Sequence, residues 1–329
     1  MYKPRLRQAL QAHAAAIIAS SFLLGIAIPT ILWVVNMINV TRCNAEYALV
    51  SPLHRCAPLF SNQKKEYEAF QDELKLWIAS QKDVGTVQYV SVYFRDLDNG
   101  PWFGVGEEDQ FAPASLLKVP ILMAILKEAQ TTPDLLTDQI RFNGGLGNIT
   151  NELDPEHTIT VGQTYSVTEL LDKMIIYSDN NAKELLKSWL RVRIPNRDIV
   201  AETYQNLGII QDENLDMQLT VKSYASIFRT LYNASYLTPS MSQKGLDLLS
   251  HVSFHQGIVA GVPGDIPVAH KFGVRNVDQL KQLHDCGIVY EPGTPYLLCV
   301  MTRGKDLHVL AGVIKEISHM VYMEVASRQ

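Results

Sequence analysis

The chain has 329 residues, of which 29 are Lys or Arg and 34 are Asp or Glu, so the formal net charge is −5, and 47% of the residues are hydrophobic. This hydrophobic share excludes a chain that is disordered throughout, and a slightly acidic chain without a basic block is a poor candidate for nucleic-acid binding, which needs a clustered positive surface. The length suits one large domain or two of ordinary size.

The first feature along the chain is an uncharged, mostly apolar stretch over residues 14–40. As a helix it would be about 40 Å long, against a hydrocarbon core of about 30 Å. Lys3, Arg5 and Arg7 precede it, and a basic flank stays on the cytoplasmic side. The alternative, a cleaved signal peptide, has a shorter apolar core and a small-x-small cleavage site. We therefore expect a single-pass anchor in the cytoplasmic membrane, with residues 1–13 inside and the remaining chain extracellular or periplasmic.

The four cysteines fall into two pairs in the sequence, Cys43 with Cys56 and Cys286 with Cys299. An exported domain permits disulfides. Two strand-like runs flank the turn at 291–294, and a tight register through that turn places Cys286 opposite Cys299, within disulfide reach. Four buried free thiols are the alternative.

The exported part begins with a stretch at 41–60 that contains two prolines and no clear period, and we expect it to be a stalk. Apolar residues at spacings of three and four then predict a helix over 61–83. Two strand-like runs follow at 89–97 and 102–106, and the Asp-Asn-Gly sequence at 98–100 between them predicts a hairpin.

The pattern then changes to helices and returns to strands near the end. An apolar run at 115–129 predicts a buried helix, and a capping box at 166–169 begins a helical region that continues to about residue 250. Strand-like runs and a C-terminal helix make up the last third. This order predicts an α+β fold in which both ends of the chain build one antiparallel sheet and a helical block is inserted between them.

Three short motifs indicate a catalytic function. The first is S-x-x-K at Ser115–Lys118. Residues three apart share one face of a helix, so the amine of Lys118 can lie beside the hydroxyl of Ser115 and accept its proton. Burial of a lysine lowers its pKa enough for this function. The alternative is a helix-capping serine followed by a surface lysine. A second copy of the motif, Ser61–Lys64, is interpreted as the solvated start of a helix.

The second motif is Ser178-Asp179-Asn180, between two helical segments. Its serine could relay a proton and its asparagine could hold a substrate carbonyl. Because Ser, Asp and Asn are all capping residues, a simple helix-capping turn is the alternative.

The third motif is Lys271-Phe272-Gly273, in a strand-like run that continues to Val274. A lysine that faces a cleft attracts carboxylates, and a glycine lets a substrate approach the strand closely. The alternative is an edge-strand lysine that opposes aggregation.

Taken together, the three motifs resemble the S-x-x-K, S-D-N and K-T-G signature of the class A β-lactamases and the penicillin-binding proteins. They occur in the same order, 63 and 93 positions apart, and the resemblance covers residues 61–329. It implies a β-lactamase-like serine hydrolase domain with a five-stranded antiparallel sheet, helices on both faces of that sheet, and a helical subdomain.

The resemblance also implies the parts that the motif residues play. Ser115 would be the acylated nucleophile, Lys118 its base, and Ser178 the group that passes a proton to the leaving nitrogen. Asn180 would line the cleft, and Lys271 would attract the substrate carboxylate.

Two further implications concern the strand of the third motif and the substrate. Gly273 would let the substrate approach the strand, and the backbone N–H groups of Val274 and Ser115 would form an oxyanion hole. The substrate would be a β-lactam or a peptide of the D-Ala-D-Ala type from peptidoglycan, with no cofactor. His251 and His255 are four positions apart but lack a third ligand nearby, so no metal site is expected.

The sequence departs from the family pattern at two points. Phe272 replaces the Thr or Ser whose hydroxyl binds the substrate carboxylate, and phenylalanine has no such donor. The E-x-x-L-N sequence of the class A loop is missing from 209–219, where Glu213 is the sole glutamate and so the candidate base for deacylation. A solvated loop acid is the alternative for Glu213. Three readings follow: an efficient hydrolase, a DD-peptidase-like or sensor domain that is acylated without efficient deacylation, and a structural surface protein.

Overall fold

The computed structural model describes residues 47–51, 67–98, 100–145, 155–209, 217–277 and 280–328. The expected anchor at 14–40, the N-terminus at 1–13 and most of the expected stalk lie outside these residues, as do Cys43, Cys56 and Glu213. Within the described ranges, no helix is long and apolar enough to cross a membrane. The larger of two compact units comprises 49–51 with 59–329 and is described by itself below.

This unit contains α-helices, shorter 3₁₀ helices and strands in an alternating order. The α-helices are α2 (Glu68–Asp83), α3 (Lys118–Ala129), α4 (Val167–Ile176), α5 (Asn180–Arg193), α6 (Ile199–Asn206), α7 (Val221–Tyr232), α8 (Pro239–Ser250) and α9 (Leu307–Ala326). The 3₁₀ helices are η2 (Ala114–Leu117), η3 (Pro133–Thr137), η4 (Pro155–His157) and η5 (Ile258–Gly261). The strands are β1 (Tyr89–Asp96), β2 (Trp102–Val105), β3 (Gln110–Phe111), β4 (Gln139–Arg141), β5 (Thr164–Ser166), β6 (Leu219–Thr220), β7 (Val268–Val277), β8 (Leu280–Val289) and β9 (Tyr296–Gly304).

The main sheet has five strands in the order β2-β1-β9-β8-β7, and every neighbouring pair is antiparallel. Two strands come from the start of the domain and three from its end, which confirms the expected sheet built from both chain ends. The register of β8 on β9 places Cys286 opposite Cys299, and a disulfide joins them, as the turn between the strands predicted. The β1–β2 hairpin is also confirmed.

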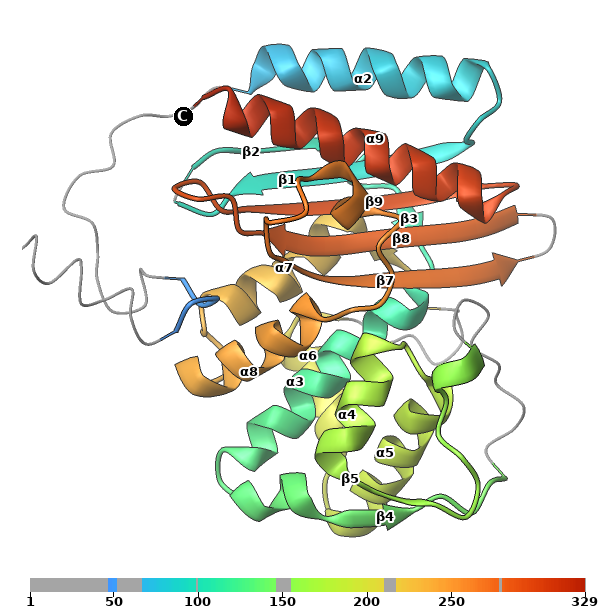
Figure 1. Cartoon of the computed structure of the whole chain (residues 1–329), viewed down its shortest axis with the longest axis vertical. Helices are drawn as coiled ribbons and strands as arrows, with labels where there is room; N and C mark the ends of the chain where they lie inside the picture. Colours follow the sequence, from blue (N-terminus) through green and yellow to red (C-terminus); the bar gives the residue numbers. More distant parts are fainter. Residues whose placement is uncertain are drawn as a thin grey trace, which may run out of the picture. The chain divides into compact units, whose positions relative to one another are not determined.

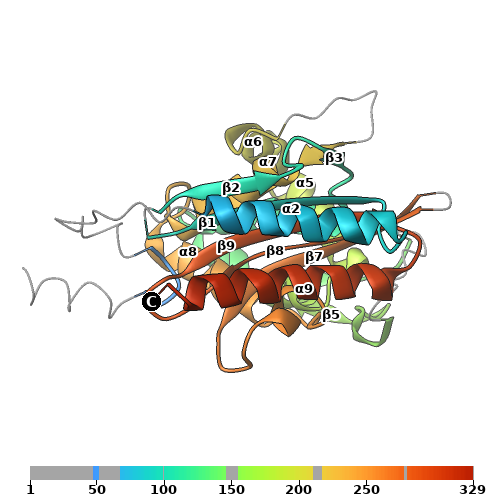
Figure 2. The ribbon, with the colours of Figure 1, turned by 90° about the horizontal axis from the view of Figure 1, so that it is seen from above.

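Helices cover both faces of this sheet. Figure 1 shows α2 and α9 over one face and the block that contains α3 to α8 over the other, and Figure 2 shows α2 and α9 side by side across the strands. On α9, the residues Leu310, Ile314, Ile317 and Val321 recur at spacings of three and four and are all buried, so one stripe of the helix packs on the sheet. The expected α+β architecture is thus confirmed.

The buried helix expected at 115–129 is divided where the motif lies. Residues 114–117 form the 3₁₀ turn η2, and the α-helix α3 begins at Lys118. Pro120 then occupies the first turn of α3, where its missing N–H has no helical acceptor to lose. Ser115 therefore lies on a separate tight turn that precedes the helix, and this placement decides where its hydroxyl points.

Candidate active site

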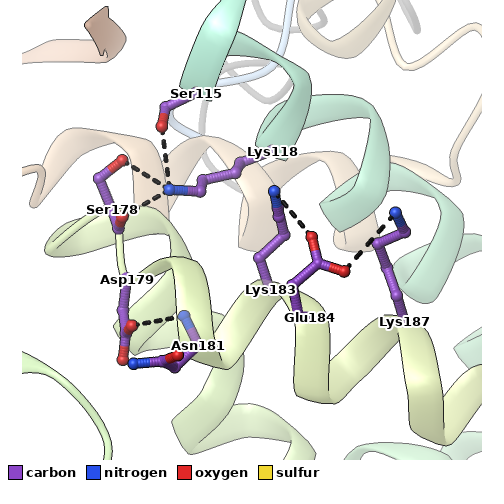
Figure 3. Close-up of polar contacts among 8 residues, drawn as sticks. All are labelled: Ser115, Lys118, Ser178, Asp179, Asn181, Lys183, Glu184 and Lys187. Carbon is purple, nitrogen blue, oxygen red and sulfur yellow. Dashed lines mark hydrogen bonds and ion pairs between the residues drawn. The ribbon is translucent and has the colours of Figure 1, made fainter. Parts of the chain in front are cut away.

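Lys118 brings the first two motifs together. Its Nζ lies 3.0 Å from Ser115 Oγ, 3.0 Å from Ser178 Oγ and 2.5 Å from the backbone oxygen of Ser178. Figure 3 shows the amine between the two hydroxyls, one from the turn before α3 and one from the loop before α5. Sixty residues separate Lys118 from Ser178 in the chain, so the tertiary fold creates this cluster.

The surroundings of Lys118 favour the neutral amine. The side chain is 1% exposed, and its pKa is held well below the usual lysine range, first by burial and then by the charges of Lys271 and Lys183. A neutral amine has two N–H groups and one lone pair. Three neighbouring oxygens therefore suit it, because it donates to two acceptors of Ser178 and can accept the proton of Ser115.

Three residues from other elements hold the turn that carries Ser115. His284 Nε2 is 3.1 Å from the Ala112 oxygen, and the Tyr224 hydroxyl donates to the Leu116 oxygen at 2.8 Å. Burial lowers the pKa of His284 to about 4. The backbone N–H of Thr302 donates to Nδ1 of His284 at 3.3 Å, so the neutral ring carries its proton on Nε2 and donates to the chain.

Gly273 supplies the third contact with this turn. A Cβ added at Gly273 would lie 3.0 Å from the Pro113 oxygen and 3.2 Å from the Leu116 nitrogen. Strand β7 therefore approaches the backbone on both sides of Ser115 more closely than a larger residue would allow. The glycine of the third motif lets β7 pack directly on the nucleophile turn.

The loop at Ser178 has a backbone conformation that few residues adopt. Ser178 has a φ of +57°, in the left-handed region, and is 3% exposed. Asp179 fixes the loop, since its carboxylate accepts hydrogen bonds from the Ile159 N–H at 2.8 Å and the Asn181 N–H at 2.8 Å. Asn180 is the first residue of α5 and is half-buried. The loop thus aims both oxygens of Ser178 at Lys118.

Lys271 is placed differently from what the family pattern implies. It is fully buried, and its Nζ lies 3.2 Å from the Phe272 oxygen and 3.9 Å from the centre of the Phe272 ring. Burial lowers the pKa of Lys271 to about 7, while the negative charge of Asp285 partly opposes the shift. Asp285 is itself bound to His270, whose Nδ1 is 2.8 Å from its carboxylate. Phe272 therefore replaces the expected hydroxyl and also contacts the cation.

The pairing of β7 shows which backbone groups face away from the sheet. Tyr290 N–H donates to the Pro267 oxygen, so these two residues form a hydrogen-bonded pair that continues the β7–β8 register. Because hydrogen-bonded pairs recur at every second residue of an antiparallel ladder, residues 269, 271 and 273 of β7 are also hydrogen-bonded to β8. Val274 therefore points its N–H away from β8, at the free edge of the sheet. Ser115 lies before the first hydrogen bond of η2, from Leu116 N–H to Pro113 O, so its N–H has no acceptor within that turn.

Reasoning from the sequence had missed His284, Tyr224 and the anchoring carboxylate of Asp179. His284 and Tyr224 lie 172 and 108 residues from the backbone atoms that they bind, and in the sequence they look like ordinary core residues. Glu213 is outside the described residues. Within the described ranges no group of three or more His, Cys, Asp or Glu side chains could hold a metal ion.

The sheet, the helical block and the Ser–Lys–Ser cluster together define a serine-enzyme fold of the class A β-lactamase type. The chain belongs to the β-lactamase enzyme family, whose model matches residues 69–325. A comparison with curated proteins gave no match.

Solved structures share this fold at low sequence identity. PBP-A is 20% identical with a TM-score of 0.66, and the match covers 82% of this chain and all of PBP-A. A β-lactamase from Xanthomonas campestris is 21% identical with a TM-score of 0.65, covering 77% of this chain and 98% of that one. A class A β-lactamase from Mycobacterium abscessus is 23% identical with a TM-score of 0.63, covering 78% and 98%.

Proposed function

We propose that the domain is an acyl-transfer enzyme that acts on β-lactams or on D-Ala-D-Ala-type amides through an acyl-Ser115 intermediate. The observation that carries this proposal is the position of the buried Lys118 amine at 3.0 Å from both the Ser115 and the Ser178 hydroxyls, where burial lowers its pKa well below the usual lysine range. Such an arrangement activates a serine that is otherwise a weak nucleophile.

The acylation step follows from these contacts. Lys118 Nζ accepts the proton of Ser115 while Oγ forms a bond with the substrate carbonyl carbon. The N–H groups of Ser115 and Val274 stabilise the negative oxygen of the tetrahedral intermediate. When that intermediate collapses, the C–N bond breaks, and Ser178 delivers to the leaving nitrogen the proton that Lys118 had taken. Lys271 attracts the carboxylate of the substrate.

Deacylation decides between two functions. A water that attacks acyl-Ser115 needs a base, and Glu213 is our candidate in the segment where class A enzymes carry theirs. The second function is a DD-peptidase-like or penicillin-binding domain that is acylated and deacylates slowly. The contact of Lys271 with the Phe272 ring favours it, because the cation lacks the neighbouring hydroxyl for a substrate carboxylate. Among the structural neighbours, a PBP-A mutant is known as an acyl-enzyme complex with penicillin G.

The test uses the full chain and a fluorescent penicillin, with the adduct followed by intact mass. We expect one adduct per chain, absent in Ser115→Ala and slowed at least 100-fold in Lys118→Met. Ser61→Ala is the matched control, because it alters the other S-x-x-K sequence and should label normally. An adduct that clears within minutes identifies a β-lactamase, and Glu213→Gln should then stop clearance. A persistent adduct identifies the second function. If Ser115→Ala is still labelled, both proposed functions are contradicted, because both require an acyl-Ser115 intermediate.

We further propose that residues 14–40 anchor this domain outside the cytoplasmic membrane. Support comes from the length of the uncharged stretch and from the basic residues before it. Protease added to intact spheroplasts should digest the domain and leave a membrane-bound fragment. Recovery of the intact chain in the soluble fraction, or full protection from protease, would contradict this topology.

A further inference from the structure

A buried carboxylate lies behind the strand of the third motif. Asp285 of β8 is fully buried, and each of its two carboxylate oxygens has a hydrogen-bond partner. His270 Nδ1 lies 2.8 Å from one oxygen, and the backbone N–H of Ile258 donates to the other at 2.9 Å. Gly257 lets this backbone approach, since an added Cβ would lie 2.4 Å from the second oxygen. Two hydrogen bonds thus hold Asp285 inside the protein.

The charge of this carboxylate needs a compensating cation, because an isolated ionised group is costly to bury. His270 does not supply it. Nε2 of His270 is buried and has no hydrogen-bond partner among the residues that the structure describes. A protonated ring would bury a second N–H without an acceptor, whereas the neutral ring donates its single proton from Nδ1 to Asp285. The pair therefore carries one negative charge.

The ammonium group of Lys271 is placed to compensate that charge. In the register of β7 on β8, Phe272 lies opposite Asp285, so the two side chains are neighbours on one face of the sheet. Lys271 reaches the Phe272 ring, with Nζ 3.9 Å from the ring centre. Burial lowers the pKa of Lys271, and the negative charge of Asp285 opposes that shift. Cation and carboxylate thus both adjoin Phe272.

No other buried anion lies on the described elements that pack against β7. The 3₁₀ helices η2 and η5 contain no titratable residue. The remaining titratable side chains around this strand come from β7 itself, α3, β8, α8 and the segment after α8: Arg275, Lys118, Lys281, His284, Lys244, Asp247, His251 and His255. All of these except Asp247 are bases, and Asp247 is exposed. Asp285 is therefore the negative charge that acts on Lys271.

We propose that Asp285, held by His270, is a positioning residue that keeps the Lys271 ammonium charged for the carboxylate of the substrate. The inference rests on the proposed acyl-transfer function and deepens it, since it names the group that lets a buried lysine attract an anion near neutral pH. A substrate that carries a carboxylate gains from Asp285, and a neutral analogue does not. The effect is electrostatic, and no bond to Asp285 forms or breaks.

The test uses the full chain, a penicillin and the methyl ester of that penicillin, with acylation of Ser115 followed by intact mass over a range of pH. Asp285→Asn removes the charge and keeps the shape of the side chain. We expect the fall in rate with the penicillin to begin about one pH unit lower than in the wild type, which reduces the rate constant at pH 8 about tenfold. At pH 5 the two proteins should agree within about twofold.

The methyl ester separates an electrostatic effect from a structural one. It has no carboxylate, so its acylation rate in Asp285→Asn should equal that in the wild type at every pH. Asp265→Asn is the matched control, because it removes an exposed carboxylate from the segment before β7 and should leave both profiles unchanged. Equal slowing with the acid and the ester, or a profile that does not move, would overturn the inference.

A measurement without substrate distinguishes failure of this inference from failure of the proposed function. If neither penicillin nor ester acylates the wild type, the function fails, and denaturant unfolding decides the role of Asp285. With a pKa of about 7, Lys271 makes the free energy of unfolding rise with pH from that value upwards. In Asp285→Asn the rise should begin about one pH unit lower, and a rise that begins at the same pH excludes Asp285. If Asp285→Asn does not fold, Asp285→Ser, which is smaller and also uncharged, replaces it in both measurements.

Discussion

The ammonium nitrogen of Lys271 lies 3.9 Å from the centre of the Phe272 ring, the side chain of the next residue along the same strand. Neighbouring residues in a strand point to opposite faces, so such a contact requires the lysine to curl around the backbone. This is feasible because β7 is an edge strand of the sheet, with no further strand on its outer side among the residues that the structure describes. Burial of this side chain lowers its pKa to about 7, so the charge of Lys271 changes near neutral pH.

The first prediction concerns the pH dependence of acylation. With a pKa of about 7, Lys271 loses its charge as the pH rises through neutrality. The second-order rate constant for acylation by a penicillin should therefore fall between pH 6 and 9. The methyl ester of the same penicillin lacks the carboxylate that Lys271 attracts and should show no such fall. Equal pH profiles for acid and ester would contradict this assignment.

Phe272→Thr should move that profile. Loss of the ring admits water, which raises the pKa of Lys271, and the new hydroxyl can bind the substrate carboxylate. We expect the fall in rate to shift to higher pH and the acylation rate at pH 8 to rise severalfold. Phe254→Leu is the control, because the Phe254 ring packs 4.7 Å from that of Phe272 but belongs to another segment. A profile unchanged in Phe272→Thr would exclude Phe272 as the cause.

The second prediction is that the buried lysine lowers stability at neutral pH. The pKa of Lys271 is about 7 in the folded protein, against 10.5 for a lysine in the unfolded chain. Between pH 7 and pH 10.5 the unfolded chain therefore binds more protons than the folded protein does. The free energy of unfolding should rise with pH across that window, by at most about 1.4 kcal/mol per pH unit for this group. Lys271→Met should be more stable than the wild type at pH 7, with a gap that narrows towards pH 10. Denaturant unfolding at several pH values tests this, with the exposed Lys305→Met as control.

Much of the fold could be predicted because its signals are local. The turn after Tyr290 sets the register that pairs Cys286 with Cys299, and the hairpin sequence at 98–100 joins β1 to β2. The two-stranded pairs β3–β6 and β4–β5 were not predicted, since strands of two or three residues are too short to show a period.

The candidate site was predictable in composition but not in geometry. The motifs named Ser115, Lys118 and Ser178, and spacing explains why the first two meet. Nothing local indicates that His284 and Tyr224 hold the nucleophile turn, because those contacts exist only after the sheet and α7 have packed. The position of Lys271 also depends on β7 being an edge strand, which is a property of the strand order.

The third prediction separates the hydroxyl of Ser178 from its backbone. Ser178 has a φ of +57°, which glycine adopts without the steric cost of about 1 kcal/mol that other residues incur. Ser178→Gly keeps the backbone oxygen that Lys118 binds at 2.5 Å and removes only the side chain. The variant should be at least as stable as the wild type by thermal unfolding and should be acylated 10- to 100-fold more slowly. Ser178→Ala should lose the same activity without gaining stability. If Ser178→Gly is acylated at the wild-type rate, the Ser178 hydroxyl takes no part in acylation.

The fourth prediction tests whether β7 sets the position of Ser115. In Gly273→Ala the new methyl group would lie 3.0 Å from the Pro113 oxygen and 3.1 Å from Leu116 Cγ, so the turn between them must move by a few tenths of an ångström. Displacements of this order cost catalysis more than stability, because reacting groups tolerate little misplacement. We expect the acylation rate to fall by at least tenfold.

Gly312→Ala is the matched control, because a Cβ at this position of α9 would meet nothing within 4 Å. The free energy of unfolding should rise by about 0.5–1 kcal/mol, and the acylation rate should not change. If Gly273→Ala is acylated like the wild type, β7 does not position the nucleophile, and the contacts from His284 and Tyr224 must suffice.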